Sequence, residues 1–235
     1  MFSIRKAHET QLQMSKHIIS EDTLPTKIHL VAGEDVAYVR DVPVGAVAVL
    51  KYETLDLLES KTALCKTRIP YIPTLLSFRE VWPITSSINK LENQPDVFLV
   101  GGLGFAHPYH CGLASHLGLA MGKPTIGVAK KRLFGEVEND KLDKDTIFLK
   151  HDGEIVGAVV KTRTGSKPIY VSVGHMISLR TAIRIVKECT RHHRLPEPLL
   201  KAHEIATDEK RKIHIASENT SKECCVNCSV LNSKL

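Results

Sequence analysis

The sequence lacks any long apolar run. No stretch approaches the about 20 residues that a helix needs to cross a bilayer. The N-terminal segment MFSIRKAHETQLQ also lacks the uninterrupted apolar core of a secretory signal. These absences predict a soluble protein located in the cytoplasm, with no membrane contact, and we expect a monomer.

Paired cysteine motifs are also scarce. Six cysteines are present, but Cys225 and Cys228 form a lone Cys-x-x-Cys pair, whereas structural zinc commonly takes two such pairs. Without secretion, a disulfide framework is not expected. Residues 216–235 are rich in Ser, Asn and Lys and are predicted to be a disordered tail. Residues 1–215 are long enough to bury the core of a single domain.

Acidic residues are outnumbered. The chain has 32 Lys and Arg against 26 Asp and Glu, a formal charge of +6 and a pI near 9.0. Such a balance favours a polyanionic partner such as nucleic acid. A merely soluble basic surface is the alternative, and charge alone does not decide between the two.

A parallel α/β unit lies at the centre of the chain. The run VFLV at 97–100 is apolar on both faces and stops at a Gly-rich loop, which is typical of a buried central strand. A helix over 113–121 and a strand over 124–128 follow. Ligands of such sheets bind beyond the carboxyl ends of the strands, which here means residues 101–108. No acidic residue stands at this strand tip.

The remaining pattern predicts further strands and helices around this unit. An imperfect helical stripe over residues 4–18 comes first, and a charged loop is expected over 136–145. The other predicted elements are strands at 31–38, 44–52, 55–64, 146–149, 155–161 and 169–172, and helices at 75–91, from Ser178 (a plausible N-cap), and at 199–212.

Several charged residues in this frame suggest chemistry on phosphate. Asp35 interrupts an apolar strand, although a strand-edge or turn residue is equally compatible with the pattern. Glu80 lies in the early turns of a helix, where a solvated surface residue is the ordinary case. Lys130 and Lys131 follow a strand, and His175 ends another. Acids ringed by bases at one end of a sheet suit Mg²⁺-dependent phosphodiester cleavage.

The chain resembles the endonuclease V family over about residues 31–198. The resemblance rests on eight motif groups in register, which makes it specific, although any one of them alone is weak. These are AGEDV at 32–36, PYIP at 70–73 with SFRE at 77–80, GLGFAHP at 102–108, ASHLG at 114–118, PTIGVAKK at 124–131, GSKP at 165–168, GH at 174–175 and RLPEP at 194–198.

The resemblance implies an RNase H-like fold, a central mixed sheet flanked by helices. It implies an endonuclease of nucleic acid repair that uses Mg²⁺, or alternatively Mn²⁺, and cuts DNA or RNA on the 3′ side of hypoxanthine. Asp35 and Glu80 match the metal-binding carboxylates, and Lys130 and His175 match basic residues around the scissile phosphate. Tyr71 matches an aromatic wedge, which would stack in the gap left by an extruded base. Further nucleic-acid-binding positions are expected at Pro73, Gly102, Gly104, His107, Lys131 and Ser166.

One departure from the family pattern concerns the strand tip. The family has Asp-Gly-(His, Gln or Asn)-Gly where this chain has Gly101-Gly102-Leu103-Gly104, so a metal-binding acid is missing at Gly101. Asp96 begins the same strand, roughly 16 Å away. Glu34 neighbours Asp35 but should point to the opposite face of its strand. The imidazole of His107 suits Mg²⁺ poorly, so no neighbour is an evident substitute.

Two functions are therefore compatible with the sequence. One is an endonuclease, weakened in activity, that works with Asp35, Glu80 and His175. The other is a binder of inosine-containing or structured nucleic acid that does not cut. An engineered or sequence-level change at Gly101 in an otherwise ordinary enzyme is a third possibility, but it leaves Leu103 unexplained.

Overall fold

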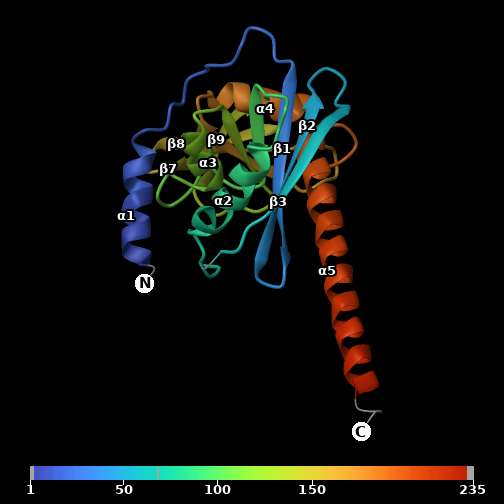
Figure 1. Cartoon of the computed structure of the whole chain (residues 1–235). Helices are drawn as coiled ribbons and strands as arrows, with labels where there is room; N and C mark the ends of the chain where they lie inside the picture. Colours follow the sequence, from blue (N-terminus) through green and yellow to red (C-terminus); the bar gives the residue numbers. More distant parts are fainter. Residues whose placement is uncertain (1–2, 68, 232–235) are drawn as a thin grey trace.

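A nine-stranded mixed sheet organises the chain, in the order β3-β2-β1-β4-β5-β9-β8-β7-β6. The computed structural model describes residues 3–67 and 69–231, apart from the side chains of residues 138–140 and 217–231. Figure 1 shows the sheet at the centre, with helices on both sides. The strands are β1 Leu30–Val39, β2 Val42–Lys51, β3 Leu57–Leu64, β4 Val97–Val100, β5 Thr125–Ala129, β6 Glu136–Asp143, β7 Thr146–His151, β8 Glu154–Val160 and β9 Ile169–His175.

Three central strands run parallel, which determines where a site can form. β4 pairs in parallel with β1 on one side and with β5 on the other, while all other neighbours are antiparallel. The carboxyl ends of β1, β4 and β5 therefore meet at one end of the sheet. All four residues of β4 are buried, as its continuous apolar run predicts.

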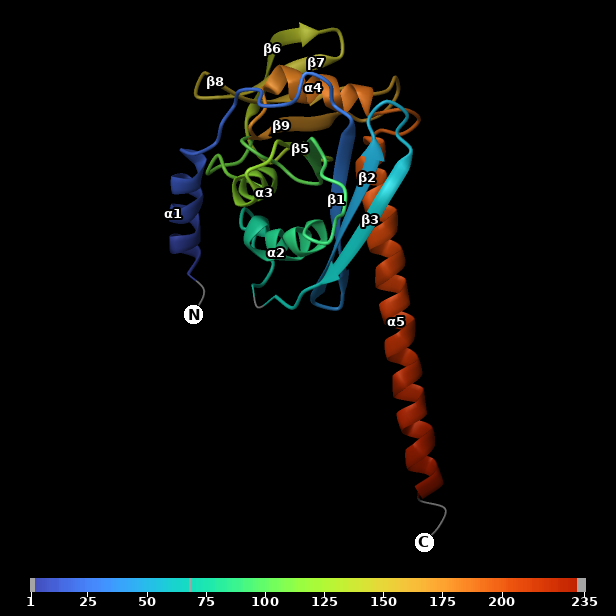
Figure 2. The same cartoon turned by 45° about the horizontal axis from the view of Figure 1, so that its top comes forward.

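Helices cover both faces of the sheet. The packing of alternate residues of β4 shows which helices lie on each face. Val97 and Leu99 pack in one cluster with residues of α4 and α5, whereas Val100 packs with residues of α2 and α3. Figure 2 shows α2 and α3 on one side of the sheet and α4 on the other. The helices are α1 Ile4–Ser15, α2 Leu76–Ile88, α3 Leu113–Met121, α4 Leu179–Glu188 and α5 Glu197–Leu231.

The start of α5 is held tightly against β1. A Cβ atom on Gly33 would lie 2.1 Å from the carbonyl carbon of Pro198, so only glycine permits this approach. Leu199 and Ala202 of α5 are buried against the same face. This contact fixes the first turns of α5 relative to the parallel strands.

Most predicted elements are confirmed, and two differ. Ser178 caps α4 by accepting the N–H of Thr181 at 3.2 Å, as expected. Residues 136–143 form edge strand β6 rather than a loop, because an edge strand that pairs with β7 alone tolerates charged residues such as Glu136 and Lys141, which are exposed. The backbone of α5 continues to Leu231, beyond the predicted end near Lys212.

Other expectations concern the cysteines and the tail. Cys111 and Cys189 are buried free thiols, and Cys65 is half-buried. The side chains of Cys225 and Cys228 lie outside the described residues, and disorder of residues 216–235 stays a prediction. Among the described helices, none is long and apolar enough to cross a membrane.

Candidate active site

A cleft of about 530 Å³ opens where β4 ends beside β1. β4 stops at Val100, opposite Glu34, but β1 continues to Val39 paired only with β2. The sheet is therefore open on one side of β1 from Asp35 onward. Predicted site residues that line this cleft are Asp35, Tyr71, Pro73, Gly101, Gly102, His107, Lys130 and Lys131.

Asp35 contacts a histidine that the sequence analysis did not identify. Its Oδ2 atom lies 2.6 Å from Nδ1 of His203, and both residues line the cleft. Asp35 lies two residues after Gly33 and therefore on the same face of β1. Because Gly33 packs on the start of α5, Asp35 faces that helix. His203 keeps 61% of its side chain exposed, so its ring remains accessible to a substrate.

Glu80 is a buried carboxylate rather than a solvated surface residue. It is 8% exposed, and its Oε1 atom accepts a hydrogen bond from the Tyr38 hydroxyl at 2.7 Å. Burial raises the pKa of Glu80 to about 7; the Tyr38 hydrogen bond lowers it in part, and the charge of Asp35 adds a smaller rise. Glu80 and Asp35 are therefore close enough for their charges to interact.

Glu34 is a third acid at this site. Its side chain is 1% exposed, and its Oε1 atom accepts the N–H of Gly101 at 2.9 Å. The other oxygen, Oε2, is buried without a hydrogen-bond partner. Burial, and then the charges of Asp35 and Glu80, raise the pKa of Glu34 well above its ordinary value.

These three carboxylates match the chemistry of a hard divalent cation. Mg²⁺ and Mn²⁺ prefer oxygen ligands, and the unpartnered Oε2 of Glu34 is such a donor. No three His, Cys, Asp or Glu side chains among the described residues are arranged closely enough to hold a metal ion. Asp35 is instead engaged with His203, and Glu80 with Tyr38. The donor set fits a metal, while its present arrangement is not a complete metal cage.

An aromatic and a basic rim border the acids. Tyr71 is 68% exposed, in the loop before α2, and Pro73 beside it is also exposed. Lys130 and Lys131 are exposed directly after β5. These are the positions at which a wedge and phosphate contacts were predicted.

Ser166 lies at the same end of the sheet but does not line the cleft. Its turn precedes β9, whose first residues pair with the end of β5. Arg194 links the two segments by donating to the carbonyl oxygens of Lys130 and Pro168, at 2.7 and 2.5 Å. The Ser166 hydroxyl itself donates to the Arg163 carbonyl oxygen.

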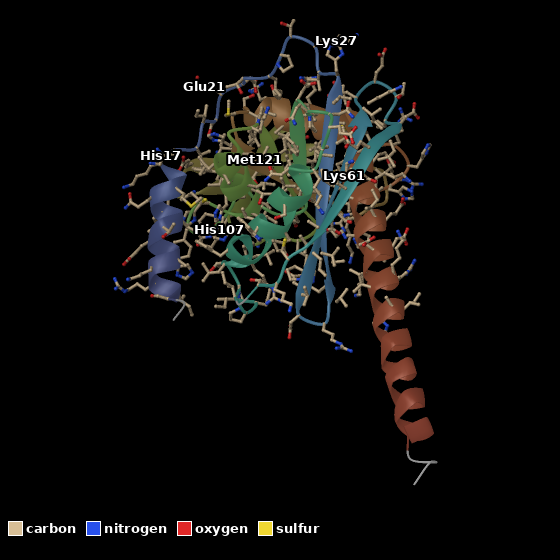
Figure 3. All side chains as sticks on the ribbon, in the orientation of Figure 1. His17, Glu21, Lys27, Lys61, His107 and Met121 are labelled. Carbon is tan, nitrogen blue, oxygen red and sulfur yellow. The ribbon has the colours of Figure 1, made fainter. Side chains whose placement is uncertain are left out.

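His107 lies deeper than the rim. It is 3% exposed, and burial lowers its pKa to about 4, so the ring is neutral at pH 7. Figure 3 labels it among the side chains between α1 and α2. His107 lines the cleft as an uncharged donor or acceptor rather than as a cation for phosphate.

His175, which was predicted to be catalytic, lies at the end of the sheet away from the cleft and does not line it. His175 pairs with Thr125 at the start of β5, whereas Lys130 follows its end, about 16 Å along the strand. Its Nδ1 atom accepts the N–H of Ile19 at 3.2 Å, which anchors the N-terminal segment. β9 is antiparallel to β5, so the carboxyl end of β9 lies at the end of the sheet opposite the cleft.

Gly104, which was predicted to contact nucleic acid, lies beneath the loop and outside the cleft lining. Gly104 is buried and does not line the cleft; its N–H donates to the Ser172 hydroxyl at 2.9 Å. A Cβ atom there would lie 2.0 Å from the Val173 carbonyl oxygen. This glycine permits close packing on β9 and is not available to a ligand.

A sheet with parallel central strands and antiparallel flanks, covered by helices on both faces, is typical of the RNase H-like class of proteins. The family model described as Endonuclease V matches residues 12–204. This chain therefore belongs to the endonuclease V family, as the sequence motifs indicate, and with it to a family of hydrolases that act on nucleic acid.

Relatives and solved structures agree over most of the chain. Endonuclease V from Thermofilum pendens is 44% identical over 207 residues, which are 88% of each protein. Endonuclease V from Nostoc sp. is 42% identical, over 88% of this chain and 95% of the relative. The crystal structure of endonuclease V from Streptomyces avermitilis has a TM-score of 0.84 at 33% identity, covering 91% and 96% of the two chains.

One solved relative contains nucleic acid. Endonuclease V of Ciona intestinalis, in complex with a 24mer DNA containing an inosine followed by a ribo-adenosine, has a TM-score of 0.81 at 31% identity. It aligns with 89% of this chain and 98% of its own. The RNase H-like fold predicted from the motifs is confirmed by these likenesses.

Proposed function

We propose that this protein hydrolyses a phosphodiester bond on the 3′ side of hypoxanthine, in DNA or RNA, with Mg²⁺ or Mn²⁺. The observation that supports this most directly is one cleft that combines Asp35, exposed lysines and an exposed aromatic ring. Glu80 lies close enough to Asp35 for the charge of Asp35 to raise the pKa of Glu80. A monomer in the cytoplasm stays part of the proposal.

Asp35 and Glu80 are the residues that would hold the metal. When bound there, a divalent cation supplies charge stabilisation for the attacking and leaving oxygens of the phosphate. Burial of Glu80 excludes water from one side of this position, and the Tyr38 hydroxyl orients its carboxylate.

His203 is placed to handle a proton. Asp35 next to Nδ1 favours the ring form that carries its proton on that atom, which leaves Nε2 free to accept one from water. The exposed position of the ring at the cleft makes this proton transfer accessible to a bound strand. His203 thus takes the role that the sequence analysis gave to His175.

The rim residues bind the strand. Lys130 and Lys131 offer positive charge to phosphates beyond the end of β5. Tyr71 is exposed enough to stack in the gap left when hypoxanthine leaves the duplex. Gly102 lines the cleft beside these groups and allows a base to approach its backbone closely.

The test uses labelled DNA and RNA strands that carry a single inosine, with guanosine strands as the matched control. We expect cleavage only of the inosine strands, only with Mg²⁺ or Mn²⁺, and one nucleotide beyond the inosine on its 3′ side. Equal cleavage of guanosine strands would overturn the substrate, and metal-independent cleavage would overturn the chemistry.

A binder that does not cut is the second candidate, and the absence of a carboxylate at Gly101 is the observation that favours it. In that case the protein retains inosine strands in a binding assay without cutting them, and Gly101→Asp introduces cleavage. Cleavage by the unmodified protein at the rate of this variant would exclude the second candidate.

A further inference from the structure

We infer that Glu34 supplies the third metal-binding carboxylate of this site, in place of the acid that Gly101 lacks. The inference rests on the proposed metal-dependent function and assigns a role to a buried acid that this function has not used. Glu34 comes from the middle of β1, not from the tip of β4 where the family pattern has its acid.

The carboxylate of Glu34 lies beside the backbone of Gly101. Oε1 of Glu34 is 2.9 Å from the backbone nitrogen of Gly101, so the carboxylate lies at the residue whose side chain is missing. Glu34 does point to the face opposite Asp35, as strand alternation requires. That face is the α2 side, where Tyr38 contacts Glu80. The side chain therefore lies between β4 and the second acid of the site.

The carboxylate of Glu34 is buried on a face of β1 that is otherwise apolar. On the same face of β1, Ala32 and Val36 pack among apolar side chains. An apolar residue at position 34 would continue this packing, whereas a buried carboxylate with one unpartnered oxygen costs free energy. One N–H from Gly101 compensates part of that cost, and two neighbouring acids increase it. A cation would satisfy Oε2 and offset the three charges together.

A structural alternative is that Glu34 only caps the end of β4. The substitution Glu34→Gln separates the two roles, because its amide oxygen can still accept the Gly101 N–H while the negative charge is lost. If capping is the role, the variant keeps its metal affinity. If metal binding is the role, affinity falls although the fold is retained.

The space at Gly101 allows a second substitution, Gly101→Asp, to restore the metal binding that Glu34→Gln should weaken. A Cβ atom there would lie 3.4 Å from the Glu34 carbonyl oxygen and 3.5 Å from Oδ1 of Asp35, which are ordinary contacts. An Asp side chain is therefore sterically permitted, next to Asp35. The double variant Glu34→Gln/Gly101→Asp moves the third carboxylate from β1 to the strand tip without changing the number of acids.

The experiment is a titration of the full chain with Mn²⁺, followed by electron paramagnetic resonance of the free ion, without nucleic acid. We expect Glu34→Gln to weaken Mn²⁺ binding at least tenfold and the double variant to restore it to within about threefold of the unmodified protein. Thermal unfolding with a chelator present checks that each variant folds, and Glu34→Leu is the second variant if Gln prevents folding.

Each outcome supports or overturns the inference. Unchanged Mn²⁺ affinity in a folded Glu34→Gln or Glu34→Leu variant overturns it, as does binding that first arises with Gly101→Asp. Weakening that the double variant rescues supports it. Cleavage of inosine strands is scored separately: a protein that binds Mn²⁺ through Glu34 but cuts no inosine strand refutes the proposed activity and leaves the role of Glu34 intact.

Discussion

Carboxylates lie at both ends of the sheet, and the groups around them differ. At the end away from the cleft, Asp96 accepts the N–H groups of His29 and Leu30. Asp22 there accepts from Ser178 and Thr181; burial by itself would raise its pKa, but these donors lower it overall. At the cleft end, burial and like charges raise the pKa of Glu34 and Glu80.

This contrast separates structural acids from candidate functional ones. An acid whose oxygens are matched by N–H and O–H donors stabilises the fold. Acids that crowd one another in a buried position destabilise it unless a cation is bound. The crowded acids lie at the cleft end of the sheet, which is also the end where a functional site is expected.

The largest effect is expected from Asp35→Asn. Removing this charge should lower the rate of inosine-strand cleavage about 10³-fold, equivalent to about 4 kcal/mol of transition-state stabilisation. Single-turnover cleavage measures it. The matched control is Asp22→Asn at the other end, which should cut normally but unfold at lower temperature. Equal loss of cleavage in both variants would break the distinction between the ends.

The two histidines provide the next test. His203→Ala should slow cleavage about 100-fold by removing the proton acceptor beside Asp35. His175→Ala should leave cleavage unchanged and lower the melting temperature, because it deletes the acceptor of the Ile19 N–H. Kinetics and melting curves are measured on the same samples. The reverse pattern would restore the assignment made from the sequence.

The buried acid Glu80 should oppose folding as pH rises. Its folded-state pKa of about 7 exceeds the ordinary 4.5, so the folded state binds the proton more tightly. Stability is thus lost between about pH 4.5 and 7 in metal-free protein. Glu80→Gln should become more stable than the unmodified protein across that window, by about 2–3 kcal/mol above pH 7. Urea unfolding with a chelator present measures it, and a constant difference at all pH values would contradict it.

The smallest effect, of opposite sign, belongs to Glu59. It accepts the N–H groups of Glu92 and Asn93, and these donors lower its pKa to about 2. Its stabilisation is present above about pH 4.5 and is lost as pH falls toward 2. Glu59→Gln should therefore lose about 1 kcal/mol at pH 7 and nothing near pH 2. A loss of equal size at both pH values would show that the charge is irrelevant.

The sequence predicted the architecture well because its signals are local. Apolar runs mark the strands, and Ser178 marks a helix start. The edge strand over 136–143 was missed because its charged residues resemble a loop when the partner strand is unknown. Asp35 and Glu80 were identified by motif, and the structure places them near each other.

His203 was missed because no local signal distinguishes it among the twelve histidines of the chain. Its contact with Asp35 depends on how α5 packs on Gly33, which is a tertiary fact. The RLPEP motif at 194–198 includes the first residues of the helix that carries His203, but it ends before position 203. The burial of Glu34 over the strand tip is tertiary for the same reason.

The backbone around the strand tip determines which substitutions this part of the chain tolerates. At Gly33 and Gly104 any side chain would collide with backbone atoms, so these glycines cannot be exchanged. Gly101 is different, because a side chain there would make only ordinary van der Waals contacts. Leu103, in contrast, is packed in an apolar cluster with Ala106, Leu149 and Val156, where a polar residue would lose that packing. The strand-tip loop therefore accepts an acid at position 101 at little steric cost, while position 103 is bound to the apolar core.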